Sequence, residues 1–396
     1  MTYQIVNWNM DTWVLNVKGK LPDTGIADYL NQMQETARDL EQDVATAWSF
    51  CGMTLYIKPH GAGRQWRWLL YCGDHYLHLD VGKGRFNHTM CRVRLSSQLL
   101  HEHGPADALN LVYNFLVSIF GESFTLQVSE VHLCLDIAGW ELSIEDTGCF
   151  VTRGRAKKAM LADEDEGESQ ASPDVTFTGR RVTQFDFSKT APHSCCIYDK
   201  TKEVQVHQKQ WFHAVWKQHG WDGESRVTRI EFRYERECLH EMGIECPYEM
   251  LDQVGSLWAY STQKWLRHCA PNGDTNQSRW PLSDVWCLVQ QPPEMGEAVP
   301  AVREKKVELD AERAKAGFVG YATSWAVREV FRYQQGAMTM QGDPLGLPLD
   351  VVEDDGAGFL AWAFDPVRAY LDERKAATFI GVMQEKARRL GLVLAA

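Results

Sequence analysis

Apolar and polar side chains alternate with a period of two in several stretches of this 396-residue chain. From Glu130 to Ile137 every second residue is apolar, and the same alternation returns from Val227 to Tyr234. Successive side chains of a strand point to opposite faces, so each stretch predicts a strand with one apolar and one polar face. Further strand-like runs lie at residues 5–8, 12–17, 53–58, 65–72, 76–81, 91–95, 175–179 and 183–187.

Helical spacing of apolar residues marks other parts of the chain. It runs over residues 26–49, over 105–120 after Pro105, and again over residues 237–268. We therefore expect an α+β fold in which helices flank an antiparallel sheet, with an added helical C-terminal region. The expected domains are an N-terminal α+β subdomain over residues 1–123, a domain with the alternating strands over residues 124–290, and the helical C-terminal region over residues 291–396.

The first alternating strand carries chemistry on its polar face. Val131, Leu133, Leu135 and Ile137 share the apolar face, whereas Glu130, His132 and Asp136 share the other. These polar residues are poor choices for an ordinary strand surface, so they indicate a row of ligands. An exposed sheet face with ordinary polar alternation is the competing interpretation.

A tyrosine lies within the stretch HSCCIYDKTKE, residues 193–203. Continued as a strand, this stretch places Tyr198 and Lys200 on one face. A phenol has a pKa near 10, so it attacks phosphorus well only where a cation stabilises the phenolate, and Lys200 is a candidate for that cation. The alternative is a half-buried strand tyrosine followed by a solvated hairpin shoulder.

The second alternating strand, VTRIEFRY, places Arg229, Glu231 and Arg233 on one face. Such a row can be a surface ion-pair ladder that contributes little stability. It can equally be a carboxylate metal ligand flanked by two arginines that bind phosphate.

Composition narrows the class of protein. The net charge of −12 argues against a protein that coats nucleic acid indiscriminately, yet residues 177–236 hold eleven Lys or Arg against seven Asp or Glu. The eleven cysteines have no zinc-type spacing and no C-x-x-C pair, so we expect reduced thiols in the cytoplasm. The chain starts without a basic, apolar leader and has no apolar run of about 18 residues, so we expect neither secretion nor a membrane span.

The three polar faces become one site if their strands are neighbours in one sheet. A divalent cation held by carboxylates would then lie beside a tyrosine and a cluster of cations. Hard oxygen ligands suit Mg²⁺ or Mn²⁺, which polarise a phosphodiester. This combination predicts tyrosyl transesterification of DNA.

The motifs IYDKTKE, VHLCLDIAG and TRIEFRY, in this arrangement, resemble the Rep_trans family of rolling-circle replication initiators, which also includes relaxases of conjugative elements. The resemblance covers about residues 124–240 and implies an antiparallel sheet related to HUH endonucleases. It implies Tyr198 as the nucleophile, Lys200 and Glu203 as flanking motif residues, and Asp136 and Glu231 as acidic site residues. Two positions depart from the family pattern: His132 replaces the usual first Asp, and Cys196 replaces the usual Arg before Ile-Tyr.

The implied activity is metal-dependent nicking and closing of a plasmid replication origin, leaving a 5'-phosphotyrosine link and a free 3'-hydroxyl. The expected partner is partly single-stranded origin DNA; a helicase or a second copy of the chain are further candidates, placed in the C-terminal region. A relaxase that starts conjugative transfer and a non-catalytic, sequence-specific DNA-binding regulator remain alternatives. The candidate site residues are Tyr198, Lys200 and Arg229 for catalysis, Arg180, Arg181 and Arg233 for DNA binding, and His132, Asp136, Glu203 and Glu231 for the metal.

Overall fold

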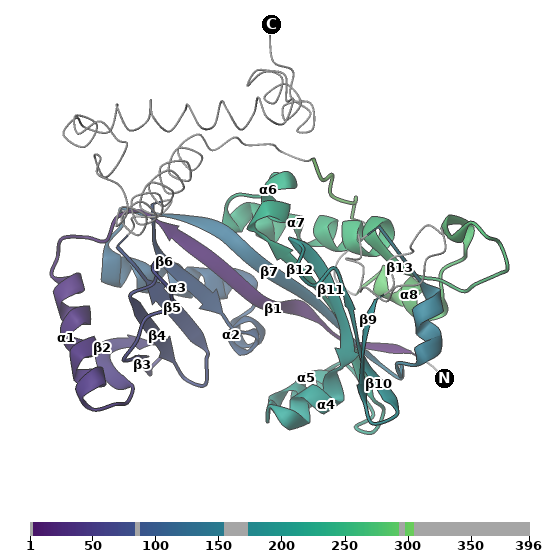
Figure 1. The fold of residues 1–396 in the computed structure, drawn as a ribbon, viewed down its shortest axis with the longest axis horizontal. Helices are drawn as coiled ribbons and strands as arrows, with labels where there is room; N and C mark the ends of the chain where they lie inside the picture. The colour runs from purple at the N-terminus through teal and green to yellow at the C-terminus, as the bar shows by residue number, and fades with distance from the viewer. Residues whose placement is uncertain (1–2, 84–87, 154–172, 293–297, 305–396) are drawn as a thin grey trace, which may run out of the picture. The chain divides into compact units, whose positions relative to one another are not determined.

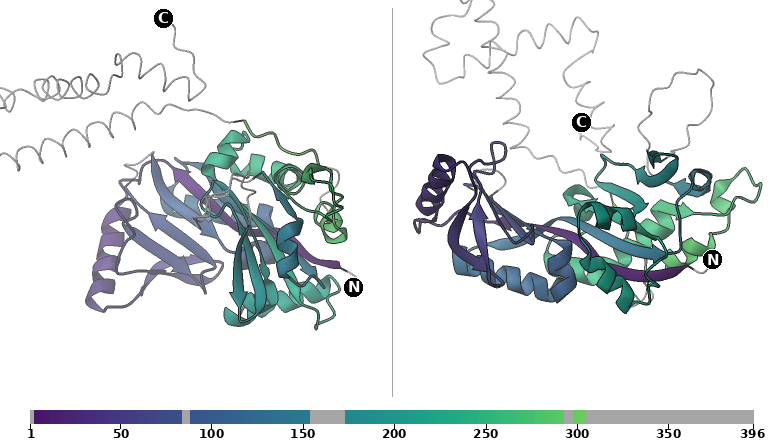
Figure 2. Two further views of the ribbon diagram at one scale, coloured as in Figure 1. Left: turned by 45° about the vertical axis from the view of Figure 1, so that its right-hand side comes forward. Right: turned by 90° about the horizontal axis from the view of Figure 1, so that it is seen from below.

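An antiparallel sheet of eleven strands runs through the described part of the chain, in the order β2-β3-β4-β5-β6-β1-β7-β12-β11-β10-β9 (Figure 1). The structure is a computed structural model that describes residues 3–83, 88–153, 173–292 and 298–304. Strand β1, Gln4–Lys18, pairs with β6 on one side and with β7 on the other. It therefore joins a half of the sheet made of early residues to a half made of later ones (Figure 2). The other strands of this sheet are β2 Val44–Phe50, β3 Met53–Ile57, β4 Trp68–Cys72, β5 Leu77–Val81, β6 Thr89–Leu95, β7 Thr125–Ala138, β9 Asp174–Thr178, β10 Arg181–Phe187, β11 His193–Asp199 and β12 Val227–Glu235.

Helices connect and cover these strands. A second, two-stranded sheet pairs β8, Phe150–Thr152, with β13, Leu266–His268. The α-helices are α1 Ile26–Asp39, α2 Ser97–His103, α3 Pro105–Phe120, α4 Lys200–Val206, α5 Trp211–Gln218, α6 Arg236–Glu241, α7 Pro247–Ala259 and α8 Asp284–Val289. Shorter helical turns are η1 Ile144–Cys149, η2 Tyr260–Trp265, which is a π-helix, and η3 Gln277–Arg279.

The larger of two apolar clusters lies on one face of the sheet; the smaller one includes Phe212 and Trp216 of α5. Trp13 and Leu15 of β1 are fully buried in the same cluster as Leu116 of α3 and Phe232 of β12. Burying a side chain of this size stabilises the fold by about 1.5–3 kcal/mol. Because strand side chains alternate, filling this face sends the polar residues of β1, β7 and β12 to the other face.

The predicted α+β class, with a large antiparallel sheet and several helices, is confirmed. The helix expected over residues 26–49 is wrong in its second half, since α1 ends at Asp39 and residues 44–50 form β2. Thr46, Trp48 and Phe50 alternate with exposed residues, and this period of two outweighs the helical spacing. The boundary expected between residues 123 and 124 lies between α3 and β7. Strands on both sides of this boundary, β1–β6 before it and β7 after it, belong to the same sheet.

The chain divides into two compact units, Met1–Glu304 and Lys305–Ala396, and every described residue belongs to the first. The helical region expected over residues 291–396 therefore lies almost wholly outside the described residues. No described helix is both long and apolar enough to cross a membrane. All eleven cysteines are unpaired thiols.

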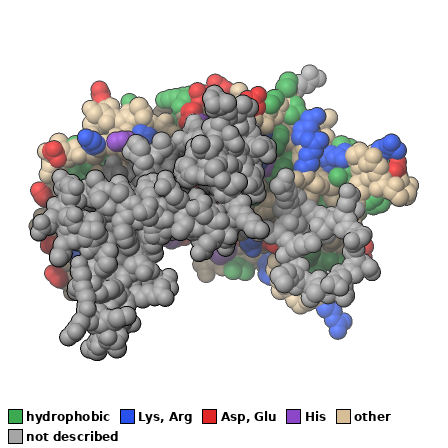
Figure 3. All heavy atoms as spheres, turned by 45° about the horizontal axis from the view of Figure 1, so that its top comes forward, with side chains coloured by type: hydrophobic (Ala, Val, Ile, Leu, Met, Phe, Trp, Pro, Cys, Tyr) green, Lys and Arg blue, Asp and Glu red, His purple; other side chains and the backbone are tan. Residues whose placement is uncertain are grey.

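Charge is unevenly distributed over the surface that Figure 3 shows. Asp and Glu gather along its left margin and top, and the largest group of Lys and Arg lies toward its right. The acidic net charge therefore does not describe each local surface.

Candidate functional site

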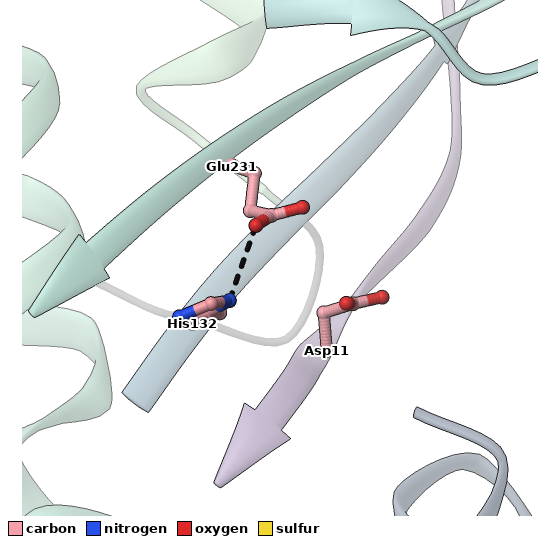
Figure 4. Close-up of side chains that lie close together, drawn as sticks. All are labelled: Asp11, His132 and Glu231. Atoms are coloured by element: carbon pink, nitrogen blue, oxygen red, sulfur yellow. Dashed lines mark ion pairs between the residues drawn. The ribbon is translucent and has the colours of Figure 1, made fainter. Parts of the chain in front are cut away.

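Three side chains that can hold a divalent cation meet on the polar face of the sheet. Asp11 comes from β1, His132 from β7 and Glu231 from β12 (Figure 4). Their candidate ligand atoms all lie within 4.8 Å of one another. The set of two carboxylates and one imidazole fits a divalent cation such as Mn²⁺, which accepts oxygen ligands.

A β-bulge directs Asp11 into this group. Along β1, Met10 lies opposite Leu133 and Thr12 lies opposite His132, so Asp11 has no partner of its own in β7. An extra residue of this kind bends a strand locally and interrupts the regular alternation of side chains. Asp11 and Thr12 therefore both lie on the polar face, while Met10 and Trp13 on either side of this pair are buried.

His132 is oriented by carboxylates at both ring nitrogens. Its Nε2 lies 2.7 Å from Oε1 of Glu130, and its Nδ1 lies 3.1 Å from Oε1 of Glu231. Burial lowers the pKa of His132, but the hydrogen bonds and charges of the two glutamates outweigh burial and raise that pKa to about 9. A carboxylate behind a metal-binding histidine fixes which nitrogen is free to bind, so Glu130 directs Nδ1 toward Glu231 and Asp11.

Glu231 is the most enclosed of the three groups, with 4% of its side chain exposed. Burial alone would raise its pKa, but the hydrogen bond and charge of His132, together with Arg233 and Arg229, hold the pKa well below its ordinary value. Nε of Arg233 donates to Oε1 of Glu231 at 2.8 Å, while 42% of the Arg233 side chain stays exposed. Glu231 is therefore an ionised carboxylate at neutral pH.

The hydroxyl of Tyr198 reaches the same carboxylate. Tyr198 lies in β11, opposite Arg229 of β12, and its hydroxyl donates to Oε2 of Glu231 at 3.1 Å. Burial first, and then the charge of Glu231, raises the pKa of Tyr198 well above its usual value. The phenol is thus protonated in this arrangement, with an acceptor already in hydrogen-bond reach.

Asp136, expected from the sequence as a metal ligand, lies outside the group of three. Its carboxylate accepts from Nε of Arg229 at 2.6 Å and from Nη2 of Arg229 at 2.8 Å, and from Trp216 and Asn7 at 2.9 and 3.0 Å. Asp136 and Arg229 are both fully buried. The carboxylate that lies beside His132 and Glu231 is Asp11, and Arg229 also donates to it.

Lys200 and Glu203 lie at the start of α4 rather than on a strand. Asp199 ends β11 and caps α4 by accepting from the backbone N–H of Lys202 at 3.0 Å, so the chain turns into a helix at Lys200. Nζ of Lys200 still lies 5.7 Å from the centre of the Tyr198 ring, and 2.6 Å from Oε2 of Glu203. Glu203 also pairs with Lys209, which places it against two ammonium groups and outside the group of three.

The arginines expected to bind DNA lie in three settings. Arg233 borders the site, as described above. Arg181 at the start of β10 pairs with Asp199 at 3.0 Å, and Arg180 is exposed in the turn between β9 and β10. Arg233 therefore contacts Glu231, the residue that accepts from Tyr198. Arg181 contacts Asp199, the residue that follows Tyr198 and caps α4.

Sequence reasoning missed Asp11. The expected strands at residues 5–8 and 12–17 left residues 9–11 as a break, whereas β1 is continuous and bulged there. The available signal was an aspartate between two apolar segments of a single strand-like run.

Comparisons with known proteins add little. No protein-family model matches the chain, and no curated protein matches it. Among solved structures, the chain is similar to a rolling circle replication initiator protein from Geobacillus stearothermophilus, with 11% identity and a TM-score of 0.39, over 75% of this chain and 100% of that one. At this level the likeness assigns neither a fold nor an activity to this chain.

Proposed function

We propose that this protein is a metal-dependent DNA nicking and closing endonuclease that starts rolling-circle replication, with Tyr198 as its nucleophile. The observation that carries the proposal is the contact from the Tyr198 hydroxyl to Glu231, which also belongs to the Asp11, His132 and Glu231 group. The motifs around Tyr198 and Glu231, which resemble those of the Rep_trans initiators, support the proposal further. His132 stands where that family usually has an Asp, and it still offers a ligand atom within the Asp11, His132 and Glu231 group.

The reaction is the exchange of one phosphate ester for another. The phenolic oxygen of Tyr198 attacks phosphorus, and the bond from phosphorus to the 3' oxygen breaks. The phenolic proton passes to Oε2 of Glu231, the acceptor 3.1 Å away, and then to the departing 3' oxygen. The products are a 5'-phosphotyrosine link and a free 3'-hydroxyl that a polymerase can extend.

Asp11, His132 and Glu231 would hold the divalent cation, and Glu130 would keep the binding nitrogen of His132 directed at it. The cation supplies positive charge that polarises the phosphodiester and stabilises the phenolate. An imidazole in the set favours Mn²⁺ over Mg²⁺, because Mg²⁺ prefers an all-oxygen shell.

The three cationic side chains near Tyr198 have different expected roles. Arg233 is partly exposed and can contact the phosphate that Tyr198 attacks. Arg229 is fully buried and bonded to Asp136 and Asp11, so it positions the Asp11 carboxylate and its charge acts on Tyr198 without direct contact to DNA. Lys200 lies beside the Tyr198 ring and contributes positive charge there.

A relaxase that starts conjugative transfer would use the same chemistry on the same residues. The assignment as an initiator rests on the resemblance to the Rep_trans family, and the DNA sequence that the protein recognises separates the two roles.

Incubation with supercoiled plasmid carrying the native replicon tests the proposal. In Mn²⁺ the wild-type protein should convert supercoiled DNA to open circles and relaxed forms, and Tyr198→Phe should lose this activity by at least 1000-fold. Tyr234→Phe is the matched control, because Tyr234 lies in the adjacent β12 and its hydroxyl bonds to the backbone oxygen of Leu257, on the core face. Nicking that survives Tyr198→Phe, or sequence-specific binding by a wild-type protein that never nicks, would contradict the proposal; the latter would favour a regulator.

A further inference from the structure

A basic cavity lies in the N-terminal half of the sheet, apart from the tyrosine site. Its volume is about 460 Å³, and it is bounded by α1, by the connection between β3 and β4, and by residues at the ends of β5 and β6. Four cations line it together with a tryptophan: Arg38, Arg64, Arg67, Lys83 and Trp66. Within the described residues, none of these four cations belongs to an ion pair, although the chain carries a net charge of −12. Clustered cations without carboxylate partners indicate an anionic ligand.

Hydrogen bonds to uncharged groups hold the wall of the cavity in place. Nε of Arg38 donates to the backbone oxygen of Pro59 at 2.9 Å, and Nη2 of Arg38 donates to Oε1 of Gln34 at 2.8 Å. Gln34 is 1% exposed and donates in turn to the backbone oxygen of Arg67 at 2.9 Å. These neutral partners fix the Arg38 side chain while leaving its charge uncompensated.

Two glycines let the backbone of this wall pack closely. A Cβ on Gly61 would lie 2.4 Å from the backbone oxygen of Trp66, and a Cβ on Gly82 would lie 2.5 Å from that of Gln65. Neither position can accept a side chain unless the backbone shifts. The segment that carries Arg64, Trp66 and Arg67 is therefore held tightly against its neighbours.

A polar face of the sheet connects the cavity with the tyrosine site. In β4, β5 and β6, residues on one face are buried while Tyr71, His78 and Arg92 on the other are partly exposed; we call this second face the open face. Arg94 on the open face of β6 lies 3.6 Å from Glu130, the residue that orients His132. The open face thus begins at the candidate metal group.

The open face offers both stacking and cationic groups. The guanidinium of Arg92 lies 5.4 Å from the Trp66 ring, and Nζ of Lys58 lies 5.4 Å from the Tyr71 ring. Tyr71 stacks on Tyr56, whose side chain is exposed. Proteins that bind single-stranded DNA combine aromatic platforms for the bases with a cationic track for the backbone.

We propose that single-stranded DNA leaving the Tyr198 site crosses the open face and places its phosphates in the basic cavity, with a base stacked on Trp66. This inference rests on the proposed nicking function. Along β1, the seven steps from Asp11 to Lys18 span roughly 23 Å. Single-strand-binding OB folds cover about 4–16 nucleotides each. A strand of DNA that follows a path of this length would place a number of nucleotides near the lower end of that range on the protein.

Fluorescence anisotropy with labelled oligonucleotides tests the inference. The measurement uses the Tyr198→Phe background, which forms no covalent link, so binding is measured without nicking. The triple variant Arg64→Ala, Arg67→Ala and Lys83→Ala should bind a 20-nucleotide single strand at least tenfold more weakly. The slope of log K against log salt should fall by about 2, since each lost phosphate contact contributes roughly 0.7 for a single strand.

A matched triple variant removes the same charge elsewhere. Lys217, Lys264 and Arg279 are exposed on α5, η2 and η3 and are absent from the cavity lining, so their replacement by Ala should change the affinity less than twofold. Trp66→Leu should weaken binding at least fivefold with little change in the salt slope, because stacking involves no counterion release.

Equal affinity of the two triple variants would overturn the inference, as would a loss confined to duplex DNA of the same length. The result is independent of the nicking assay. If the wild-type protein fails to nick while the cavity variant loses single-strand binding, the cavity remains a DNA site and only the proposed reaction fails.

Discussion

At the scale of single residues, the site depends on carboxylates whose charges are balanced by different partners. Glu231 lies against His132 and Arg233, whereas Asp136 lies against Arg229. Two carboxylates on the same sheet face therefore have different expected roles: one in the candidate metal group and one that holds a buried guanidinium.

Replacing Asp11 tests the first role. Asp11→Asn keeps the shape of the side chain and removes one ligand charge, so we expect Mn²⁺ affinity to fall at least tenfold in isothermal titration calorimetry at pH 7.5. The control is Asp80→Asn in β5, whose carboxylate pairs with Arg92 and does not belong to the group. Unchanged Mn²⁺ binding by Asp11→Asn would remove Asp11 from the ligand set.

Replacing Asp136 tests the second role. Asp136→Asn would leave Arg229 buried with reduced compensation, so we expect the free energy of unfolding in urea to fall by about 3–5 kcal/mol. Asp80→Asn breaks a partly exposed pair with Arg92 and should cost under about 1 kcal/mol. A similar small loss for both variants would show that the buried pair is not essential to the fold.

At the scale of elements, the bulge in β1 decides which side chains meet. Met10 and Trp13 are three positions apart and both lie on the core face, which regular alternation forbids, so the bulge leaves both Asp11 and Thr12 on the polar face. The bulge places a carboxylate from β1 against residues of β7 and β12, which come more than a hundred positions later in the chain.

Exchanging the residues at the bulge tests this placement. The double variant Asp11→Thr with Thr12→Asp keeps composition and charge but moves the carboxylate to the position opposite His132. We expect Mn²⁺ affinity to fall as far as in Asp11→Asn, measured by the same calorimetry. If the exchange variant binds Mn²⁺ like the wild type, the position of the carboxylate on the bulge is unimportant.

The sequence predicted those parts of the site that obey strand periodicity. His132, Glu231 and Tyr198 were expected on one polar face because their strands alternate regularly, and the structure brings these three together. Asp11 was not predicted, because a bulge interrupts the alternation on which the prediction relies. Lys200 was expected on the strand, but the side chain of Asp199 caps a helix there, and capping is a local contact that period counting does not detect.

At the scale of the whole molecule, the sheet is stabilised by buried groups far from the site as well as near it. His193 begins β11 and is 1% exposed, with Trp265 and Tyr234 rings centred 4.3 and 4.6 Å away. Nδ1 of His193 donates to the backbone oxygen of Arg233 at 3.1 Å. Burial lowers the pKa of His193 from its ordinary value to about 3.

This shift predicts a loss of stability in acid. Because the folded pKa is depressed, the unfolded chain binds a proton below about pH 6.5 that the folded chain does not. The stabilisation is complete above pH 6.5 and is lost as the pH falls toward 3, with a slope of up to about 1.4 kcal/mol per pH unit from this group.

Urea unfolding at pH 7 and at pH 4 measures the effect. The wild type should lose more stability between these values than His193→Phe, which has no titrating ring. Equal losses for the two proteins would show that His193 does not cause the acid sensitivity.

The most direct test of the account is to find the residue that becomes covalently linked to DNA. The protein is incubated with plasmid carrying its native replicon in Mn²⁺, digested with nuclease and trypsin, and analysed by mass spectrometry. Cleavage after Lys189 and Lys200 releases residues 190–200, TAPHSCCIYDK, in which Tyr198 is the only tyrosine. We predict a nucleotide adduct on this peptide that Tyr198→Phe lacks. DNA cleavage with an adduct on another peptide, or with no adduct at all, would contradict Tyr198 as the nucleophile.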